Sequence, residues 1–157
     1  MLENEIELIK TLIQKVSSTY NIPEQEILDS IRFPSESIDV CIFSNMKLSP
    51  TEVLVKYFHE NKFKKFSEIA SMLKRNQNTI QTTYNNSKRK HPQNLRFYTT
   101  GVKVPLFIFQ TKRFTVLESL VKYLKEQKNM TNNEIAKLIK KSNKTIWTVY
   151  DRVKNKG

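Results

Sequence analysis

The strongest constraint on this chain is an internal repeat. Shifting the sequence by 66 residues aligns residues 42–90, the first repeat, with residues 108–156, the second repeat, without a gap, and 19 of the 49 aligned pairs are identical. The main identical blocks are 54–57 with 120–123, 68–70 with 134–136, and 79–80 with 145–146. Because chance does not produce such agreement, both repeats are expected to share one architecture, with the matching apolar positions as core.

Each repeat predicts three helices. Apolar residues recur at helical spacing, Ser49 followed by Pro50 marks a helix start, and Asn76 caps a later helix that His91 and Pro92 end. The expected helices are 50–61, 67–73 and 77–89 in the first repeat, and 115–128, 131–139 and 142–155 in the second. With only two glycines in the chain, the sequence predicts an all-α protein built from two tandem three-helix units.

Residues 1–38 predict a short helical hairpin ahead of the repeats. Ile6, Ile9 and Val16 recur at helical spacing, and a second short helix follows Pro23. Such an apolar face needs a partner. Packing over the first unit is the favoured interpretation, and self-association or docking of another protein, such as RNA polymerase, are the alternatives.

The expected domains are an acidic N-terminal segment at 1–38, a first unit at 39–91, a linker at 92–104 and a second unit at 105–157. Pro92, Gly101 and Pro105 mark the connection. Fully extended, the 14 residues 91–104 could reach roughly 45 Å at about 3.3 Å per residue. We therefore expect two units that are joined but separate.

One pattern is shared by the two repeats and resembles a known family. Glu-Ile-Ala is followed by a short turn, a capping Asn or Ser, and Thr-Ile early in the next helix. This resembles the helix-turn-helix of sigma-factor region four and of quorum-sensing-type response regulators, over about 45 residues of each copy. The resemblance implies that the third helix of each unit lies in the DNA major groove. It places the base-reading residues at Gln77, Asn78, Thr79, Gln81, Thr82 and Asn85, and at Asn143, Lys144, Thr145, Trp147, Thr148 and Arg152.

The turn before the third helix departs from this family. Glycine is usual there because a left-handed residue is easiest without a side chain, but this chain has Lys74 and Lys140. A left-handed lysine costs roughly 1 kcal/mol. We therefore expect a turn of a different shape.

The charge of the chain favours a polyanionic partner. The net charge is +12, yet residues 1–38 sum to −4, so the remainder sums to +16. Lys88, Arg89 and Lys154 belong to basic clusters that close the third helices, where they are expected to contact phosphates. Stabilisation of the helix dipole is the structural alternative for these cations, and neutral surface is the alternative for the amides.

Trp147 replaces Gln81 of the first repeat, so it is expected to face outward, where it would either contact a thymine methyl group or the sugar-phosphate backbone, or pack on a neighbouring domain. Several other residues are expected to be structural. The apolar runs 40–43 and 106–109 precede the units, and packing arms are favoured over short strands. Cys41 aligns with a phenylalanine and is expected to be a buried apolar filler. The tyrosines shared by the repeats are expected to belong to the scaffold.

Nothing in the sequence favours catalysis. His59 and His91 occupy unrelated positions, a single cysteine excludes a Cys-rich metal site, and two glycines are too few for a phosphate-cradling loop. We therefore expect no enzyme activity, cofactor or metal. The single cysteine and the lack of an apolar span predict a protein of the reducing cytoplasm, associated with the nucleoid when bound to DNA.

The predicted function is sequence-specific binding of double-stranded DNA in transcriptional regulation. Two non-identical recognition helices would occupy two major grooves, so we expect an asymmetric site with two unlike halves. One alternative is a protein-interaction adaptor that docks a polymerase or another acidic partner. The other is binding of structured RNA, which the narrow RNA major groove disfavours.

Overall fold

The computed structural model describes residues 1–32, 37–96 and 98–157, and only the backbone of Asp29, Ser30 and Arg32. Parts of the predicted N-terminal segment and of the predicted linker, at 33–36 and 97, lie outside the described residues. The chain divides into two compact units, Met1–Glu36 and Ser37–Gly157. Each unit is considered by itself.

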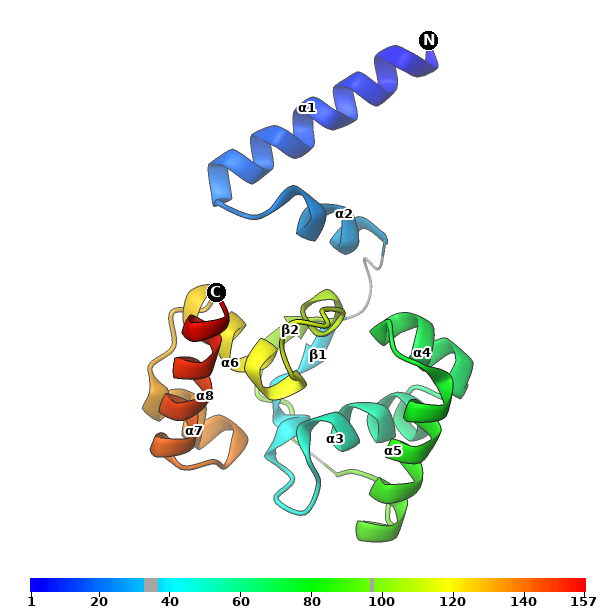
Figure 1. Ribbon diagram of the computed structural model, residues 1–157, viewed down its shortest axis with the longest axis vertical. Helices are drawn as coiled ribbons and strands as arrows, with labels where there is room; N and C mark the ends of the chain where they lie inside the picture. The colour runs from blue at the N-terminus through cyan, green and yellow to red at the C-terminus, as the bar shows by residue number, and fades with distance from the viewer. Residues whose placement is uncertain (33–36, 97) are drawn as a thin grey trace. The chain divides into compact units, whose positions relative to one another are not determined.

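The N-terminal unit consists of two helices (Figure 1). Helix α1 spans Leu2–Tyr20 and α2 spans Glu24–Arg32. Asn21 ends α1 in the left-handed conformation, with φ 53°, which an asparagine tolerates better than most residues. No residue of α1 is buried. The two predicted helices are confirmed.

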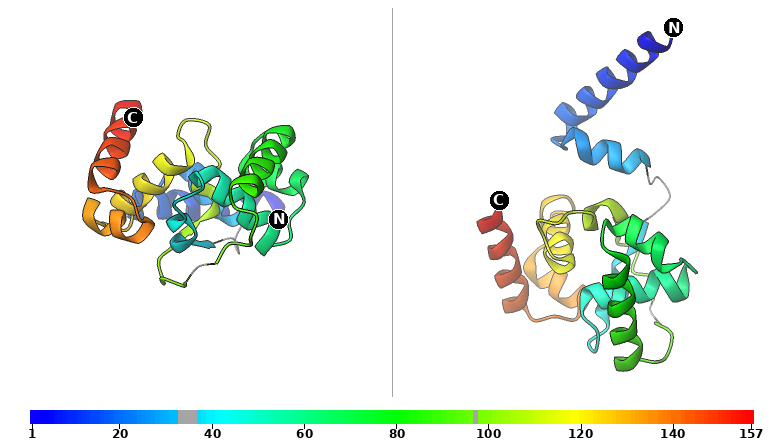
Figure 2. Two further views of the ribbon diagram at one scale, coloured as in Figure 1. Left: turned by 90° about the horizontal axis from the view of Figure 1, so that it is seen from below. Right: turned by 45° about the vertical axis from the view of Figure 1, so that its right-hand side comes forward.

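The second unit holds the six helices of the two repeats (Figures 1 and 2). They are α3 (Pro50–Lys56, continued by a π-helical turn, Tyr57–Asn61), α4 (Phe66–Leu73), α5 (Gln77–Lys90), α6 (Val116–Glu126), α7 (Asn132–Ile139) and α8 (Asn143–Lys156). The protein is mostly helical, and the only sheet among the described residues is a two-stranded ribbon. The all-α prediction is confirmed at this level.

Equivalent side chains begin the first and third helices of the two repeats. Ser49 and Glu52 form a capping box at the start of α3, and Thr115 and Glu118 form the same box at the start of α6. The third helices also begin alike, because the predicted cap Asn76 accepts a hydrogen bond from a backbone N–H of the first turn of α5, as Ser142 does in α8. Only Glu52 and Glu118 are identical among these residues, but the other aligned pairs keep a side chain that can cap a helix.

The two repeats meet at a β-ribbon that the sequence did not favour. Strand β1 (Ser37–Asp39) and strand β2 (Lys103–Pro105) pair antiparallel, with Ile38 opposite Val104. Residue 104 is also the counterpart of residue 38 in the repeat. An antiparallel pair in which each strand faces its own counterpart has a local two-fold axis, and here that axis passes through the Ile38–Val104 pair.

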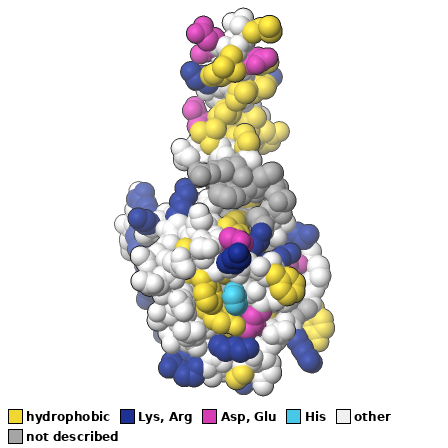
Figure 3. All heavy atoms as spheres, turned by 90° about the vertical axis from the view of Figure 1, so that its right-hand side faces the viewer, with side chains coloured by type: hydrophobic (Ala, Val, Ile, Leu, Met, Phe, Trp, Pro, Cys, Tyr) yellow, Lys and Arg dark blue, Asp and Glu magenta, His cyan; other side chains and the backbone are white. Residues whose placement is uncertain are grey.

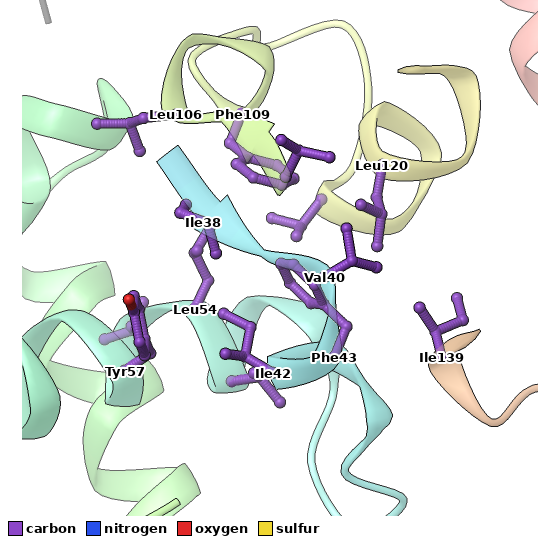
Figure 4. Packing of buried hydrophobic residues seen from close by; sticks show 14 of the residues in the cluster. Ile38, Val40, Ile42, Phe43, Leu54, Tyr57, Leu106, Phe109, Leu120 and Ile139 are labelled. Atoms are coloured by element: carbon purple, nitrogen blue, oxygen red, sulfur yellow. The ribbon is translucent and has the colours of Figure 1, made fainter. Parts of the chain in front are cut away.

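A short 3-10 helix follows each strand and crosses to the other repeat. The first arm, Val40–Ser44, packs on α7, and the second arm, Leu106–Phe109, packs on α4. Phe43 and its counterpart Phe109 meet between the repeats, with ring centroids 5.7 Å apart (Figure 4). The favoured packing arms thus exist, and each packs both on the first helix of its own repeat and on the middle helix of the other repeat. Consequently the two repeats share one hydrophobic core.

The expected linker does not join two separate units. Its final residues, Lys103 and Val104, belong to β2. Just before them, the backbone N–H of Thr100 and of Gly101 donate to the Asp39 carboxylate at 3.0 and 3.3 Å. The connection is therefore fixed against the start of the first repeat, and the expectation that it can extend is wrong. Sequence reasoning missed this because the packing of each arm on the other repeat leaves no periodic signal in the sequence.

The lysine turns do not have the altered shape that we expected. Lys74 and Lys140 adopt the left-handed conformation, with φ 52° and 54°. In each turn the following N–H, from Arg75 or Lys141, donates to the carbonyl of the alanine in the preceding helix at 2.9 Å. The turn thus keeps the shape for which glycine is usual, and lysine bears the conformational cost.

Candidate nucleic-acid interface

Helix α5 presents a continuous polar face. All six predicted reading residues of the first repeat are exposed, while Ile80 between them is buried. These exposed residues are Gln77, Asn78, Thr79, Gln81, Thr82 and Asn85. The amides of Gln77, Gln81 and Asn85 have no hydrogen-bond partner among the residues that the structure describes. This face therefore offers free donors and acceptors to a ligand.

Helix α8 presents a different surface at equivalent positions. Asn143, Lys144 and Arg152 are exposed, and Trp147 has 59% of its surface exposed, as predicted. The exposed face of α8 is therefore more cationic and more aromatic than the exposed face of α5.

Two predicted reading residues of α8 are less available. Thr145 and Thr148 are half-buried. The Thr145 hydroxyl lies 2.7 Å from the Ser142 hydroxyl, and the Thr148 hydroxyl donates to the Lys144 carbonyl at 2.9 Å. Both hydroxyls are thus already engaged within the helix.

The predicted phosphate-contacting cations have internal contacts that sequence reasoning missed. Lys88 lies 3.3 Å from the Glu60 carboxylate and donates to the Pro92 carbonyl at 2.9 Å. Arg89 donates to the Asn86 side chain at 3.3 Å, and the Lys154 ammonium lies 5.5 Å from the centroid of the Tyr150 ring. All three cations are exposed. Lys88 therefore has a structural role as well as a surface charge.

Glu60 is the acidic centre of the first repeat. Burial would raise its pKa, but hydrogen bonds from Lys56, Tyr84 and Lys88 outweigh burial and lower it. Burial, together with the hydrogen bond to Glu60, raises the pKa of Tyr84 to about 12. Glu60 therefore remains a carboxylate, and it balances the charge of Lys56 below the α5 surface.

The ends of the third helices are anchored in the same way in both repeats. Lys90 contacts Glu52 at 2.7 Å, and its counterpart Lys156 contacts Glu118 at 2.7 Å. These carboxylates also belong to the capping boxes of α3 and α6. Each contact thus ties the end of a third helix to the start of the first helix of its repeat, which fixes the orientation of the polar face.

The structure adds cations that were not among the predicted contacts. A cavity of about 460 Å³ is lined by Lys74 and Arg75 from the first repeat and by Lys112, Arg113 and Lys156 from the second. Sequence reasoning on one repeat could not find this cavity, because more than half of its lining residues belong to the second repeat.

Figure 3 shows that Lys and Arg side chains surround the visible face of residues 37–157, whereas hydrophobic side chains run along the N-terminal helix.

Cys41 is not part of any surface site. It has 4% of its surface exposed, and burial together with the neighbouring Asp39 carboxylate raises its pKa to about 12. A thiol with this pKa stays protonated and is a poor nucleophile. The prediction of a buried filler is confirmed.

Comparisons with protein-family models, characterised proteins and solved structures gave no match to this chain. Within residues 1–32, 37–96 and 98–157, no cluster of three or more His, Cys, Asp or Glu side chains could hold a metal ion. In the same ranges, no helix combines the length and the apolar character needed to cross a membrane.

Proposed function

We propose that this protein binds double-stranded DNA as a transcriptional regulator, with α4–α5 and α7–α8 acting as two helix-turn-helix units. The observation that carries the proposal is the pair of exposed polar faces on α5 and α8, at equivalent positions of one compact unit. A helix presented in this way fits the major groove, where each base pair offers a distinct pattern of donors and acceptors.

The chemistry of the two faces supports unlike half-sites. Asn78 and Gln81 carry amides, which pair in bidentate fashion with adenine. Their counterparts Lys144 and Trp147, with Arg152 nearby, suit guanine and the thymine methyl group instead. The α5 half-site is therefore proposed to favour adenine, and the α8 half-site to contain guanine.

The local two-fold axis supports a specific orientation of those halves. Because β1 and β2 pair about the Ile38–Val104 centre, we infer that the two recognition helices are related by the same approximate rotation. Proteins with two-fold symmetry read half-sites in opposite orientation along the duplex. The site is thus proposed to be an inverted arrangement of two unlike sequences. We therefore propose that the β-ribbon, in place of a flexible linker, positions the two units on successive major grooves.

A second candidate function is the docking of a protein partner through the N-terminal unit. Leu2, Ile6, Ile9 and Leu12 of α1 are each at least 43% exposed. An apolar face of this kind is typical of an interaction helix. Recruitment of a polymerase is compatible with DNA binding by residues 37–157, so the two functions are proposed to coexist.

The test of DNA binding compares two paired variants of the full chain. Asn78→Ala with Gln81→Ala, and Lys144→Ala with Arg152→Ala, are each expected to weaken specific binding by roughly tenfold or more, since each lost base contact costs about 1–3 kcal/mol. The control is Gln93→Ala with Gln127→Ala, two exposed residues outside both faces. Binding is measured by fluorescence anisotropy on a labelled duplex, with unlabelled duplex DNA or duplex RNA as competitor.

Either of two results would overturn the proposal. The first is binding that both paired variants leave unchanged, because the polar faces would then not be the contact surface. The second is competition by duplex RNA as strong as that by duplex DNA, because a helix cannot enter the deep RNA groove.

A further inference from the structure

Two basic clefts lie where one repeat meets the other. The first shares only Thr79 with the predicted reading faces, and the second shares no residue with them. We propose that these clefts are phosphate-binding clamps that each hold one strand of the nucleic-acid backbone beside a recognition helix. The proposal rests on the proposed function, and it adds a binding site assembled from both repeats.

The first cleft gathers cations without a carboxylate in its lining. Lys74 and Arg75, from the turn before α5, face Lys112 and Arg113, from the segment after the second arm. Thr111 also lines the cavity, which has a volume of about 460 Å³. Five cations in one cavity repel one another, so a bound anion is expected to relieve the repulsion.

The charges of this cleft are not neutralised internally. Lys74, Arg75 and Lys112 have no ion-pair partner within the described parts of the chain. Lys156, by contrast, contacts Glu118 at 2.7 Å. At least three positive charges therefore remain available to an anion.

The second-repeat side of the cleft is held in place by its own contacts. The Arg113 backbone N–H donates to the Thr111 hydroxyl at 3.0 Å, and the Arg113 guanidinium donates to the Lys156 carbonyl at the end of α8. The segment is thus fixed to the helix that reads the other half-site. A backbone phosphate bound here would contact both repeats at once.

The second cleft occupies the position related to the first by the local two-fold axis. Lys140, the counterpart of Lys74, lines a cavity of about 300 Å³ together with Lys47, the counterpart of Arg113. Arg96 supplies a third cation, and His91 also lines this cleft. Met46 stands where the first cleft has Lys112, so the second clamp is the weaker one.

The first cleft adjoins the start of α5, and the second is lined by Lys140 in the turn before α8. Asn76 and Thr79 line the first cleft, and Thr79 belongs to the predicted reading surface of α5. A strand that runs past the major groove occupied by α5 would therefore pass this cleft. Phosphodiester groups are the expected ligands because they carry one charge per nucleotide and recur along the strand.

The test uses a variant that removes charge without removing structure. Lys74→Gly relieves the left-handed conformation, and Lys112→Met introduces the residue that the second cleft already has. Binding of a 30-base-pair duplex is measured over a range of salt concentrations. Removing two phosphate contacts is expected to make the slope of the logarithm of the binding constant against the logarithm of the salt concentration shallower by about 2. Binding at low salt is also expected to weaken by a similar factor for all DNA sequences.

The matched control removes the same two charges elsewhere. Lys62 and Lys128 are exposed counterparts in the two repeats that line neither cleft. Lys62→Met with Lys128→Met is expected to leave the salt slope unchanged. An unchanged slope in the cleft variant, or an equal change in the control, would overturn the clamp.

A separate measurement keeps this inference distinct from the proposed function. Inorganic pyrophosphate is titrated into the ¹⁵N-labelled full chain. Chemical-shift changes are expected at the backbone amides of Thr111 and Arg75 in the wild type, and these changes are expected to be absent in the cleft variant. If duplex DNA does not bind while pyrophosphate shifts these amides, the proposed function fails and the anion site stands. If pyrophosphate shifts neither amide, the clamp is overturned whether or not DNA binds.

Discussion

The two repeats carry the same ion pair in different surroundings. Lys56 and Glu60 lie 2.7 Å apart with 0% and 8% of their side chains exposed, whereas Lys122 and Glu126 lie 2.8 Å apart with 41% and 36% exposed. Both pairs have helical i, i+4 spacing. The same sequence signal therefore gives one buried contact, on which stability depends, and one surface contact of small effect.

The neighbours explain the difference. In the first repeat, His59 stacks on Phe66 at 4.4 Å and meets the edge of Tyr84 at 4.5 Å. The hydroxyl of Tyr84 in turn donates to the Glu60 carboxylate at 3.0 Å. In the second repeat the counterparts of His59 and Phe66 are Lys125 and Asn132, which share a hydrogen bond of 2.6 Å. Aromatic packing thus shields one pair from water, while a polar contact leaves the other exposed.

The largest expected effect separates these two pairs. Glu60→Ala leaves the buried Lys56 ammonium without a partner and is expected to lower the free energy of unfolding by about 3–5 kcal/mol. Glu126→Ala is expected to cost less than about 1 kcal/mol. Urea denaturation followed by circular dichroism measures both.

A double variant tests whether the unpaired buried charge causes this loss of stability. Lys56→Met with Glu60→Leu removes both buried charges and is expected to be far less destabilising than Glu60→Ala, since no unpaired charge remains buried and Lys88, which also loses its carboxylate, is exposed. Equal losses for Glu60→Ala and Glu126→Ala would contradict the difference between the repeats.

The second effect concerns Asp39, whose counterpart in the second repeat is Pro105. Its carboxylate accepts hydrogen bonds from Cys41, Thr100 and Gly101. Asp39→Ala is expected to cost about 2 kcal/mol, the scale of hydrogen bonds to a charged group, and thermal unfolding measures it. Pro105→Ala provides the comparison and is expected to cost less.

The same carboxylate gives a pH dependence with a definite sign. Burial would raise the pKa of Asp39, but the hydrogen bonds from Cys41 and Thr100 outweigh burial and lower it from 3.8 to about 2. A lowered pKa in the folded state stabilises the protein above about pH 4, and this contribution is lost as pH falls toward 2. Asp39→Asn is expected to lack that part of the acid sensitivity. An identical acid profile for Asp39→Asn and the wild type would contradict the assignment.

The smallest expected effect tests a feature in which the repeats agree. Lys74→Gly and Lys140→Gly remove similar left-handed strain and are expected to raise the free energy of unfolding by roughly 0.5–1 kcal/mol each. Lys137→Gly, within α7, is expected to lower it by about 1 kcal/mol. Unequal gains at the two turns, measured by urea denaturation, would show that the repeats differ there as well.

Much of the local structure could be predicted from the sequence. Helix starts at Ser49 and Asn76 follow from capping chemistry, and the exposure of Trp147 follows from the glutamine in the other repeat. The helices follow from periodicity and composition. These are short-range properties, and comparing two copies within one chain reinforces each of them.

What the sequence did not predict depends on contacts between the repeats. Strands of three residues carry too little periodicity to be recognised, and the pairing of Ile38 with Val104 depends on a partner 66 residues away. The packing of each arm on the other repeat and the basic clefts follow from that pairing. The left-handed lysines were missed for a different reason, since local preference opposes them and the tertiary structure enforces them.

The central claim is that two unlike reading faces are related by a local two-fold axis, and selection of bound sequences from a random duplex library tests it most directly. For the wild-type chain we predict a bipartite site with two unlike halves. In the variant N143Q/K144N/W147Q/D151N/R152N, α8 acquires the exposed polar residues of α5, and the selected site is predicted to become a palindrome. A direct repeat selected by that variant, or a single half-site selected by the wild type, would contradict the account.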